Sequence, residues 1–286
     1  MIKASDLTRV QLIRPLWPAP DNIVAGVTTR YVNTPASPRN EAGDFASDFG
    51  DFNLAMHVGD DPRVVQSNRN SLKNQLEQIA MQVIGGSELE KALEWRWLNQ
   101  VHGDHARKFE SVTSDTTAAD AILSDQNCQV CAVLTADCLP ILLSTHSGDA
   151  VAAIHAGWRG LANGVVAATI KAMTDNGASA SKLYAWLGPA IGPGAFEVGS
   201  EVVDAFQQSR QFEGAKPQTI QQAFAPSSRS GHFFADIYQL AAIALRLCGV
   251  HGIYGGGFCT YKGNEFYSYR RQAKTGRMAS FVFKSH

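Results

Sequence analysis

Three short segments of the sequence each contain a side chain that can bind a metal ion, next to a residue that turns the chain. They are Asn-Gln-Val-His-Gly around His102, Thr-Ala-Asp-Cys-Leu-Pro around Cys138, and His-Ala-Gly-Trp-Arg-Gly beginning at His155. Imidazole and thiolate groups are ligands for zinc and copper. The intervals of 36 and 17 residues do not match a zinc finger. Spacing alone therefore leaves the alternative that each side chain is an ordinary core or surface residue.

Short apolar or β-branched runs precede or contain these segments, and such runs are typical of buried strands. We expect strands at 95–101, 131–135, 141–144, 151–155 and 184–187. Each metal-capable side chain then lies near the end of a strand. Loops that leave a rigid sheet can converge there to form a site.

Helical periodicity alternates with these strands along the chain. Apolar residues recur at helical spacing over 63–79, 161–176, 200–209 and 235–247, and Pro62 suits the first position of a helix. Further short strands are expected at 253–260, 266–269 and 280–283, whereas the composition of 34–51 is typical of an exposed loop. No repeat or linker divides the chain. We therefore expect one α+β domain over 1–286, with mixed β-sheets layered with helices.

Composition excludes several classes of function. The chain of 286 residues has 25 Lys and Arg against 26 Asp and Glu, so it lacks the basic field that attracts nucleic acid or anionic lipid. No apolar run approaches the ~20 residues of a membrane span, and the first residues do not form a signal peptide. The five cysteines are an odd number and predict free thiols, with Cys128 and Cys131 structural. We expect a cytoplasmic protein with a small-molecule substrate.

The three segments resemble those of the laccase-domain (YfiH/YlmD-like) family, whose members are also called multicopper polyphenol oxidoreductases. Further matching motifs lie at 57–61, 188–193, 196–199, 268–271 and 275–277. The likeness runs from about Gly26 to Phe283. It implies a layered α+β fold distantly like the catalytic domain of cytotoxic necrotizing factor toxins. It also implies one metal ion, held by His102, Cys138 and His155.

The resemblance implies an activity as well. Similar proteins phosphorolyse purine nucleosides, namely adenosine, inosine, guanosine and methylthioadenosine, and deaminate adenosine. Two His and one Cys with an open fourth position are the pattern of catalytic Zn²⁺, whose bound water has a pKa of about 7 and suits attack on C6 of adenine. Copper is the alternative metal. We expect a monomer that binds a nucleoside and phosphate.

Three other functions remain as alternatives. A copper-dependent polyphenol oxidase is disfavoured, because the eight histidines contain no His-X-His pair of the kind that builds a multicopper site. A branch of the family is associated with correcting peptidoglycan precursors. A Cys-His hydrolase acting on them would use Cys138 as its nucleophile and His155 or His102 as its base. A metal-dependent nucleotide sensor would bind nucleosides without turnover.

Phosphorolysis requires a site for an anion, and Arg159 is the main candidate. It follows His155 by four residues and precedes the helix expected from 161, so its guanidinium and the helix dipole can point at one phosphate. A surface role is the alternative. Arg30 and Asn53 are expected to contact substrate, because the family folds the N-terminal motif region toward the metal.

Four more residues are candidates for acid–base or structural roles. Glu197 is a candidate for the proton shuttle of zinc deaminases, with a structural role at a helix start as the alternative. Asp137 neighbours Cys138 and is expected to act as a structural hydrogen-bonding group. Arg270 and Arg271 are expected either to serve the site or to form structural ion pairs.

Overall fold

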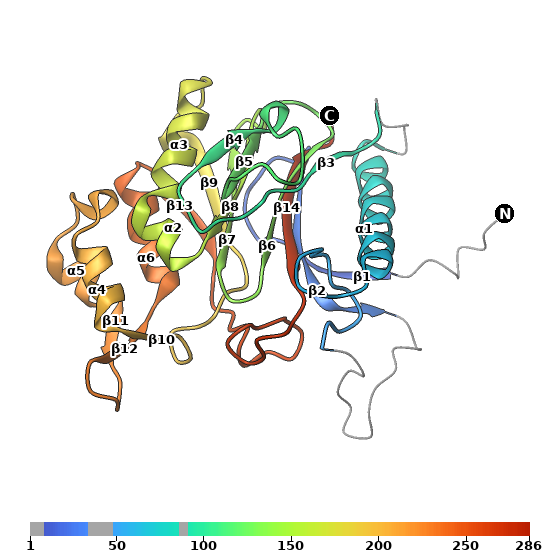
Figure 1. Cartoon of the computed structure of the whole chain (residues 1–286). Coiled ribbons are helices and arrows are strands. Elements are labelled where there is room, and N and C mark those ends of the chain that lie inside the picture. The colour runs from blue at the N-terminus through green and yellow to red at the C-terminus, as the bar shows by residue number, and fades with distance from the viewer. Residues whose placement is uncertain (1–8, 34–47, 86–90) are drawn as a thin grey trace.

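The computed structural model describes residues 9–33, 48–85 and 91–286, which form three β-sheets and six α-helices (Figure 1). In the five-stranded sheet the strand order is β1 (Arg9–Ile13), β2 (Ile23–Asn33), β14 (Met278–Lys284), β6 (Gln129–Thr135) and β3 (Glu94–Arg96). In the six-stranded sheet it is β13 (Gly252–Gly255), β9 (Leu183–Leu187), β7 (Leu139–Thr145), β8 (Val151–Ala156), β5 (Ala121–Ser124) and β4 (Ala106–Lys108). Both sheets are mixed, as expected for an α+β fold.

The two large sheets pack face to face, with helices on their outer faces. Helix α1 (Pro62–Val83) covers the five-stranded sheet. Helices α2 (Trp158–Asn163), α3 (Val165–Asp175) and α6 (Ile237–Leu247) cover the six-stranded sheet. The order of the layers is therefore helix, sheet, sheet, helix (Figure 1).

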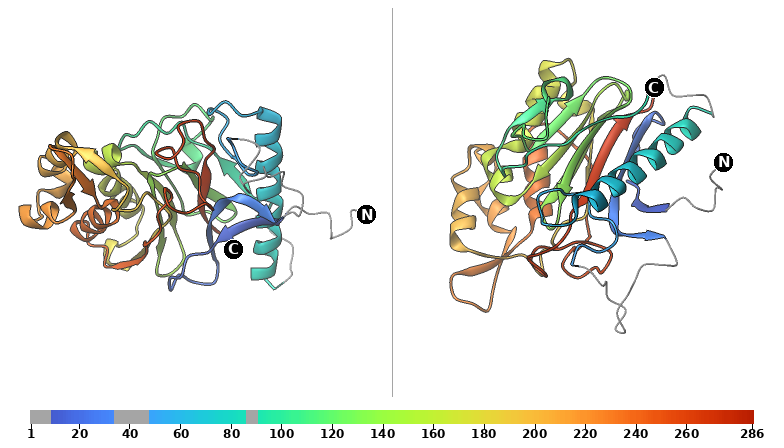
Figure 2. Two further views of the ribbon diagram at one scale, coloured as in Figure 1. Left: turned by 90° about the horizontal axis from the view of Figure 1, so that it is seen from below. Right: turned by 45° about the vertical axis from the view of Figure 1, so that its right-hand side comes forward.

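A smaller unit extends from the second helical layer. Its three-stranded antiparallel sheet has the order β10 (Glu197–Gly199), β12 (His232–Ala235) and β11 (Phe224–Pro226). Helices α4 (Ser200–Gln207) and α5 (Pro217–Gln221) accompany it. Figure 2 shows this unit at the end of the molecule opposite α1.

Alternation of side chains along the central strands builds this layering. On β6, Val130 and Leu134 face α1, whereas Val133 faces the other sheet. On β7, Leu142 faces the five-stranded sheet and Leu143 faces the helices. Every residue of β6, β7 and β8 is buried, which explains why these strands have nearly continuous apolar sequences.

Several elements depart from the sequence-based expectation. The helix expected over 161–176 is two helices, because Gly164 lies between them in the left-handed region with a φ of 106°. The strand expected over 95–101 is only Glu94–Arg96, and the one expected over 253–260 ends at Gly255, the first of three consecutive glycines with positive φ. Residues 266–269 are buried apart from Tyr269 but form no strand.

The other expected elements are present with shifted ends. Helix α1 begins at Pro62 and is capped by the Asp61 side chain, and α6 begins after its cap at Asp236. Most of the loop expected at 34–51 lies outside the described residues. Its described end is anchored, because Phe49 is buried and its carbonyl accepts a hydrogen bond from the Tyr267 hydroxyl. Within the described ranges, no helix is long and apolar enough to span a membrane.

Candidate metal centre and cavity

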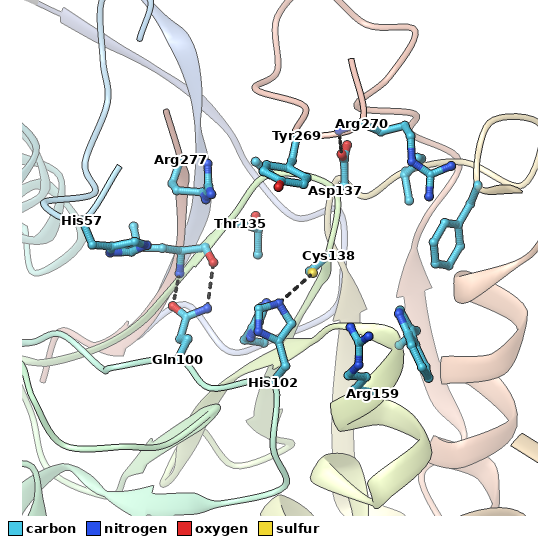
Figure 3. Close-up of a pocket in the computed structure, with 16 residues that line it drawn as sticks. His57, Gln100, His102, Thr135, Asp137, Cys138, Arg159, Tyr269, Arg270 and Arg277 are labelled. Atoms are coloured by element: carbon cyan, nitrogen blue, oxygen red, sulfur yellow. Dashed lines mark hydrogen bonds between the residues drawn. The ribbon is translucent and has the colours of Figure 1, made fainter. Parts of the chain in front are cut away.

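The structure brings His102, Cys138 and His155 together, and their potential ligand atoms all lie within 4.8 Å of one another. Figure 3 shows His102 beside Cys138. The Cys138 Sγ is 3.8 Å from Nε2 of His102, and the two imidazole rings are 4.7 Å apart between centroids. His102 lies in the loop between β3 and β4, Cys138 in the turn between β6 and β7, and His155 on β8. The convergence that spacing alone could not establish is therefore present.

Asp137 connects the turn that contains Cys138 to the C-terminal part of the chain. Asp137 has a φ of 94°, and its carboxylate accepts hydrogen bonds from the Thr260 hydroxyl and from the backbone N–H of Arg270 at 2.7 Å. Asp137 thus forms structural hydrogen bonds, as expected. These bonds fix the point at which the chain leaves one sheet and enters the other.

A buried carboxylate supports His155 from behind. Asp120 is fully buried immediately before β5, and its Oδ1 lies 2.8 Å from Nδ1 of His155. This contact leaves Nε2 of His155 for a metal. A carboxylate behind a metal-binding histidine is a common arrangement in metal sites, because it fixes the tautomer and orientation of the ring.

Opposing effects act on the protons of Cys138 and His155. Burial alone would raise the pKa of the Cys138 thiol, but the imidazoles of His155 and His102 lower it to about 6. Burial alone would lower the pKa of His155, but the Cys138 thiolate and the Asp120 carboxylate raise it to about 9. The thiolate, which is the form of cysteine that binds metals, is therefore favoured near neutral pH.

The donor set fits a borderline or soft metal ion. One thiolate and two imidazoles suit zinc and copper and do not suit Mg²⁺ or Ca²⁺, which prefer oxygen ligands. A metal bound by these three side chains would have fewer protein ligands than a closed structural zinc site, as catalytic zinc does. Within the described ranges this is the single group of three or more such side chains arranged for metal binding. The arrangement provides for one metal ion and not for the several of a multicopper site.

A cavity of about 470 Å³ opens over the three side chains. Its walls include the aromatic rings of Trp158, Phe196 and Tyr269, together with His57. Burial and the nearby Arg277 and Arg69 guanidinium groups lower the pKa of His57, so its imidazole is neutral at pH 7. The volume and the mixture of aromatic and polar groups suit a small ligand the size of a nucleoside.

Three arginines line the same cavity, and none is in an ion pair with a carboxylate among the described residues. Arg159 is exposed, packs over Trp158 at 4.4 Å, and extends from α2 into the cavity (Figure 3). Arg270 and Arg277 donate to backbone carbonyl oxygens. Arg159 therefore lines the cavity, and its contact with phosphate stays a prediction; α2 has only six residues, too few for a strong dipole contribution.

The other two expected substrate contacts lie behind the cavity wall. Asn53 is buried and its Oδ1 accepts hydrogen bonds from the backbone N–H groups of Ala55 and Arg277, both at 3.0 Å. It therefore positions Arg277, which does line the cavity. Arg30 packs its guanidinium over the ring of Tyr267 at 5.4 Å and does not line the cavity either.

Glu197 does not reach the cavity. Its carboxylate accepts hydrogen bonds from the Ser227 hydroxyl and from Arg229, which gives Glu197 a structural role on β10 and not the helix-start role expected as the alternative to the proton shuttle. Arg271 does not line the cavity, and it donates hydrogen bonds to four backbone carbonyl oxygens; within the described ranges it forms no ion pair, which was one of its two expected roles. Among the described residues, Asp137 is the only carboxylate that lines the cavity.

Sequence reasoning missed several residues of the site. Tyr269 and Arg277 belong to matched motifs, but nothing in their spacing indicated that they face the metal ligands. Gln100 clamps the His102 loop to β6, because its amide exchanges two hydrogen bonds with the backbone of Leu134. Asp120 belongs to no recognised motif, and its role follows only from the three-dimensional contacts.

The fold and the site together define a layered α+β protein in which His102, Cys138 and His155 are placed to bind a metal ion beneath a cavity of about 470 Å³. The chain belongs to the family described as multi-copper polyphenol oxidoreductase laccase, whose model matches residues 37–285.

Related proteins cover almost the whole chain. A protein of Pseudomonas aeruginosa named as a purine nucleoside phosphorylase is 43% identical over 272 residues, which are 95% of this chain and 97% of the relative. The purine nucleoside phosphorylase YfiH of Escherichia coli is 40% identical over 274 residues, covering 96% and 98% of the two chains. The crystal structure of a Neisseria meningitidis protein is similar with a TM-score of 0.76 at 38% identity, covering 96% of this chain and 98% of that one.

Proposed function

We propose that the protein is a zinc-dependent purine nucleoside phosphorylase that also deaminates adenosine. One observation carries the proposal: the His102, Cys138 and His155 group lies in the same cavity as the Arg159 guanidinium, which forms no ion pair with a carboxylate among the described residues. The names of the Pseudomonas and Escherichia relatives support the phosphorylase activity. Zinc, rather than copper, is proposed because three ligands with an open fourth position are typical of catalytic zinc.

Phosphorolysis joins an oxygen of phosphate to C1′ of the ribose and breaks the bond from C1′ to the purine, which leaves with a proton. Arg159 would hold the phosphate dianion, because charge-assisted hydrogen bonds from a guanidinium are strong and directional. The aromatic rings of Tyr269 and Phe196 offer surfaces against which a purine can pack. A bound zinc ion would supply Lewis-acid catalysis at His102, Cys138 and His155.

Incubation of the purified protein with inosine or adenosine tests the proposal. Hypoxanthine and ribose 1-phosphate should form only when phosphate is present, and ammonia should form from adenosine with or without phosphate. Chromatography of the bases and an ammonia assay measure the two reactions. Absence of phosphate-dependent base release from metal-loaded protein would overturn the phosphorylase assignment.

A second function is favoured by one observation. The His155 imidazole lies between the Cys138 thiol and the Asp120 carboxylate, and it contacts both. The pKa of the thiol is lowered to about 6, which suits the nucleophile of a Cys-His hydrolase. A hydrolase that edits peptidoglycan precursors would use Cys138 as a free nucleophile. Such an enzyme would be active without metal and inhibited by zinc, because the metal occupies the thiolate. Turnover of a precursor peptide panel by chelator-treated protein distinguishes it.

A further inference from the structure

We propose that Asp120 is a positioning residue that holds both histidine ligands of the metal centre with one carboxylate. Its side chain is fully buried and receives four hydrogen bonds. Oδ1 accepts from Nδ1 of His155 at 2.8 Å and from the backbone N–H of His102 at 3.0 Å. Oδ2 accepts from the backbone N–H groups of Gly103 at 2.7 Å and Val101 at 3.3 Å.

The contact with His102 holds an unfavourable backbone conformation. His102 has a φ of 58°, a left-handed conformation that is uncommon outside glycine. Three successive N–H groups, from Val101 to Gly103, turn toward the same carboxylate. This arrangement compensates the cost of the turn and keeps the His102 ring beside Cys138.

The backbone of Asp120 joins the same two ligand segments. Its carbonyl accepts a hydrogen bond from the N–H of His155 at 2.7 Å, and its own N–H donates to the carbonyl of His105 at 2.9 Å. Asp120 is therefore joined to β8 and to the loop after His102 through both its side chain and its main chain. Movement of either ligand would break contacts with Asp120.

All four partners of the side chain are donors, and only an ionised carboxylate accepts on both oxygens. Asparagine, which has nearly the same shape, presents one acceptor and one donor. If its NH₂ group faced Gly103, donors would oppose each other and displace the His102 loop. If its NH₂ group faced His155, Nδ1 would have to accept, and the proton would move to Nε2, which must be free to bind metal.

The inference rests on the metal-binding part of the proposed function and not on the reaction. Zinc affinity would be measured by competition with a chromophoric chelator, for the wild type and for Asp120→Asn. We expect a 10- to 100-fold loss of affinity, the usual effect of removing a group that orients a metal ligand. The Co²⁺-substituted variant should also have an altered absorption spectrum, because its His102 and His155 ligands are displaced.

Asp236→Ala is the matched control. Asp236 caps α6 by accepting from the N–H of Gln239 at 3.0 Å, so its loss should lower the melting temperature of the metal-free protein without changing zinc affinity. Unchanged affinity and an unchanged Co²⁺ spectrum in Asp120→Asn would overturn the inference. Failure of the wild type to bind zinc would overturn the proposed metal centre instead.

A measurement on the wild type keeps the inference testable if Asp120→Asn does not fold. In zinc-loaded protein with ¹⁵N-labelled histidine, NMR should find Nδ1 of His155 protonated and Nε2 bound to metal, with the Nδ1 proton in a strong hydrogen bond. A spectrum with Nδ1 of His155 unprotonated would contradict the role of Asp120. A His155→Gln sample assigns the resonances.

Discussion

Gly157 lies so close to His102 that a Cβ added to Gly157 would sit 2.9 Å from Cδ2 of the imidazole ring. The same added atom would lie 3.1 Å from the Cys138 Sγ. Nearby, a Cβ on Gly160 would lie 2.6 Å from the carbonyl oxygen of Gly103. The glycines of the His-Ala-Gly-Trp-Arg-Gly segment thus allow the start of α2 to pack directly against the ligands.

Gly157→Ala should therefore weaken zinc binding by about tenfold or more, a change of roughly 1.4 kcal/mol. The methyl group has no room unless His102 or Cys138 moves. Chelator competition measures the affinity. Gly194→Ala is the control, because the nearest atom to its added Cβ is the Lys262 Nζ at 3.6 Å, an ordinary contact. Equal affinity in the two variants would show that the ligands have freedom to shift.

Arg159→Ala should depress phosphorolysis of inosine by about 10- to 100-fold, corresponding to the loss of a charged hydrogen bond of about 1.5–3 kcal/mol. Deamination of adenosine should change much less, because water attack involves no phosphate. Initial rates of hypoxanthine and ammonia release would be compared at matched metal occupancy, with the exposed Arg246→Ala as control. Equal loss of both rates would assign Arg159 a structural role and move the phosphate to another arginine.

Cys138→Ser should reduce bound zinc below one ion per chain and abolish both reactions. A hydroxyl is a far poorer zinc ligand than a thiolate. Elemental analysis and the two rate assays provide the measurements. Cys248→Ser serves as the control, because Cys248 is a half-buried thiol whose sulfur contacts Gln211 rather than the site. Full metal content in Cys138→Ser would remove the thiolate from the ligand set.

Asn53→Ala should destabilise the fold by about 3 kcal/mol. The substitution leaves the buried N–H group of Ala55 and the partly buried N–H group of Arg277 without their acceptor, and each unsatisfied buried group costs about 1–3 kcal/mol. Urea unfolding measures the loss, with the exposed Asn70→Ala as the control. A variant of unchanged stability but raised KM for nucleoside would instead restore the direct substrate contact that the sequence suggested.

The sequence predicted secondary structure best where a buried apolar segment also has regular backbone hydrogen bonds. The apolar runs of β6, β7 and β8 are strands because both faces are covered, and Pro62 begins α1 as its fixed φ predicts. The strand expected at 266–269 was wrong, because Phe266 and Tyr267 are buried but pair with no strand among the described residues. Periodicity reports burial, and it does not report the hydrogen-bonding partner.

At the site too, the sequence indicated some residues by their type, but it did not indicate the contacts that they make. His102, Cys138 and His155 were recognisable because metal ligation restricts residue type and each lies in a distinctive motif. The sequence shows that residue 120 is an aspartate, but it does not show that the carboxylate is buried and faces the two histidines. An aspartate on the surface would look the same in the sequence. Asn53 was expected to contact substrate, and the structure places it behind the cavity wall, where its Oδ1 accepts a hydrogen bond from the backbone N–H of Arg277. That difference depends on side-chain orientation, which no spacing rule supplies.

The crossing of the chain at Asp137 has a consequence for folding. The β6–β7 turn passes from the five-stranded sheet to the six-stranded sheet, so Cys138 lies between the two sheets. His102 follows β3 of the five-stranded sheet, and His155 lies on β8 of the six-stranded sheet. A metal ion bound by all three side chains would crosslink the two sheets. The complete metal site could form only after the sheets have packed together. Metal should therefore bind late in folding and slow the unfolding step in which the two large sheets separate. It should stabilise the native state increasingly as its free concentration exceeds the dissociation constant.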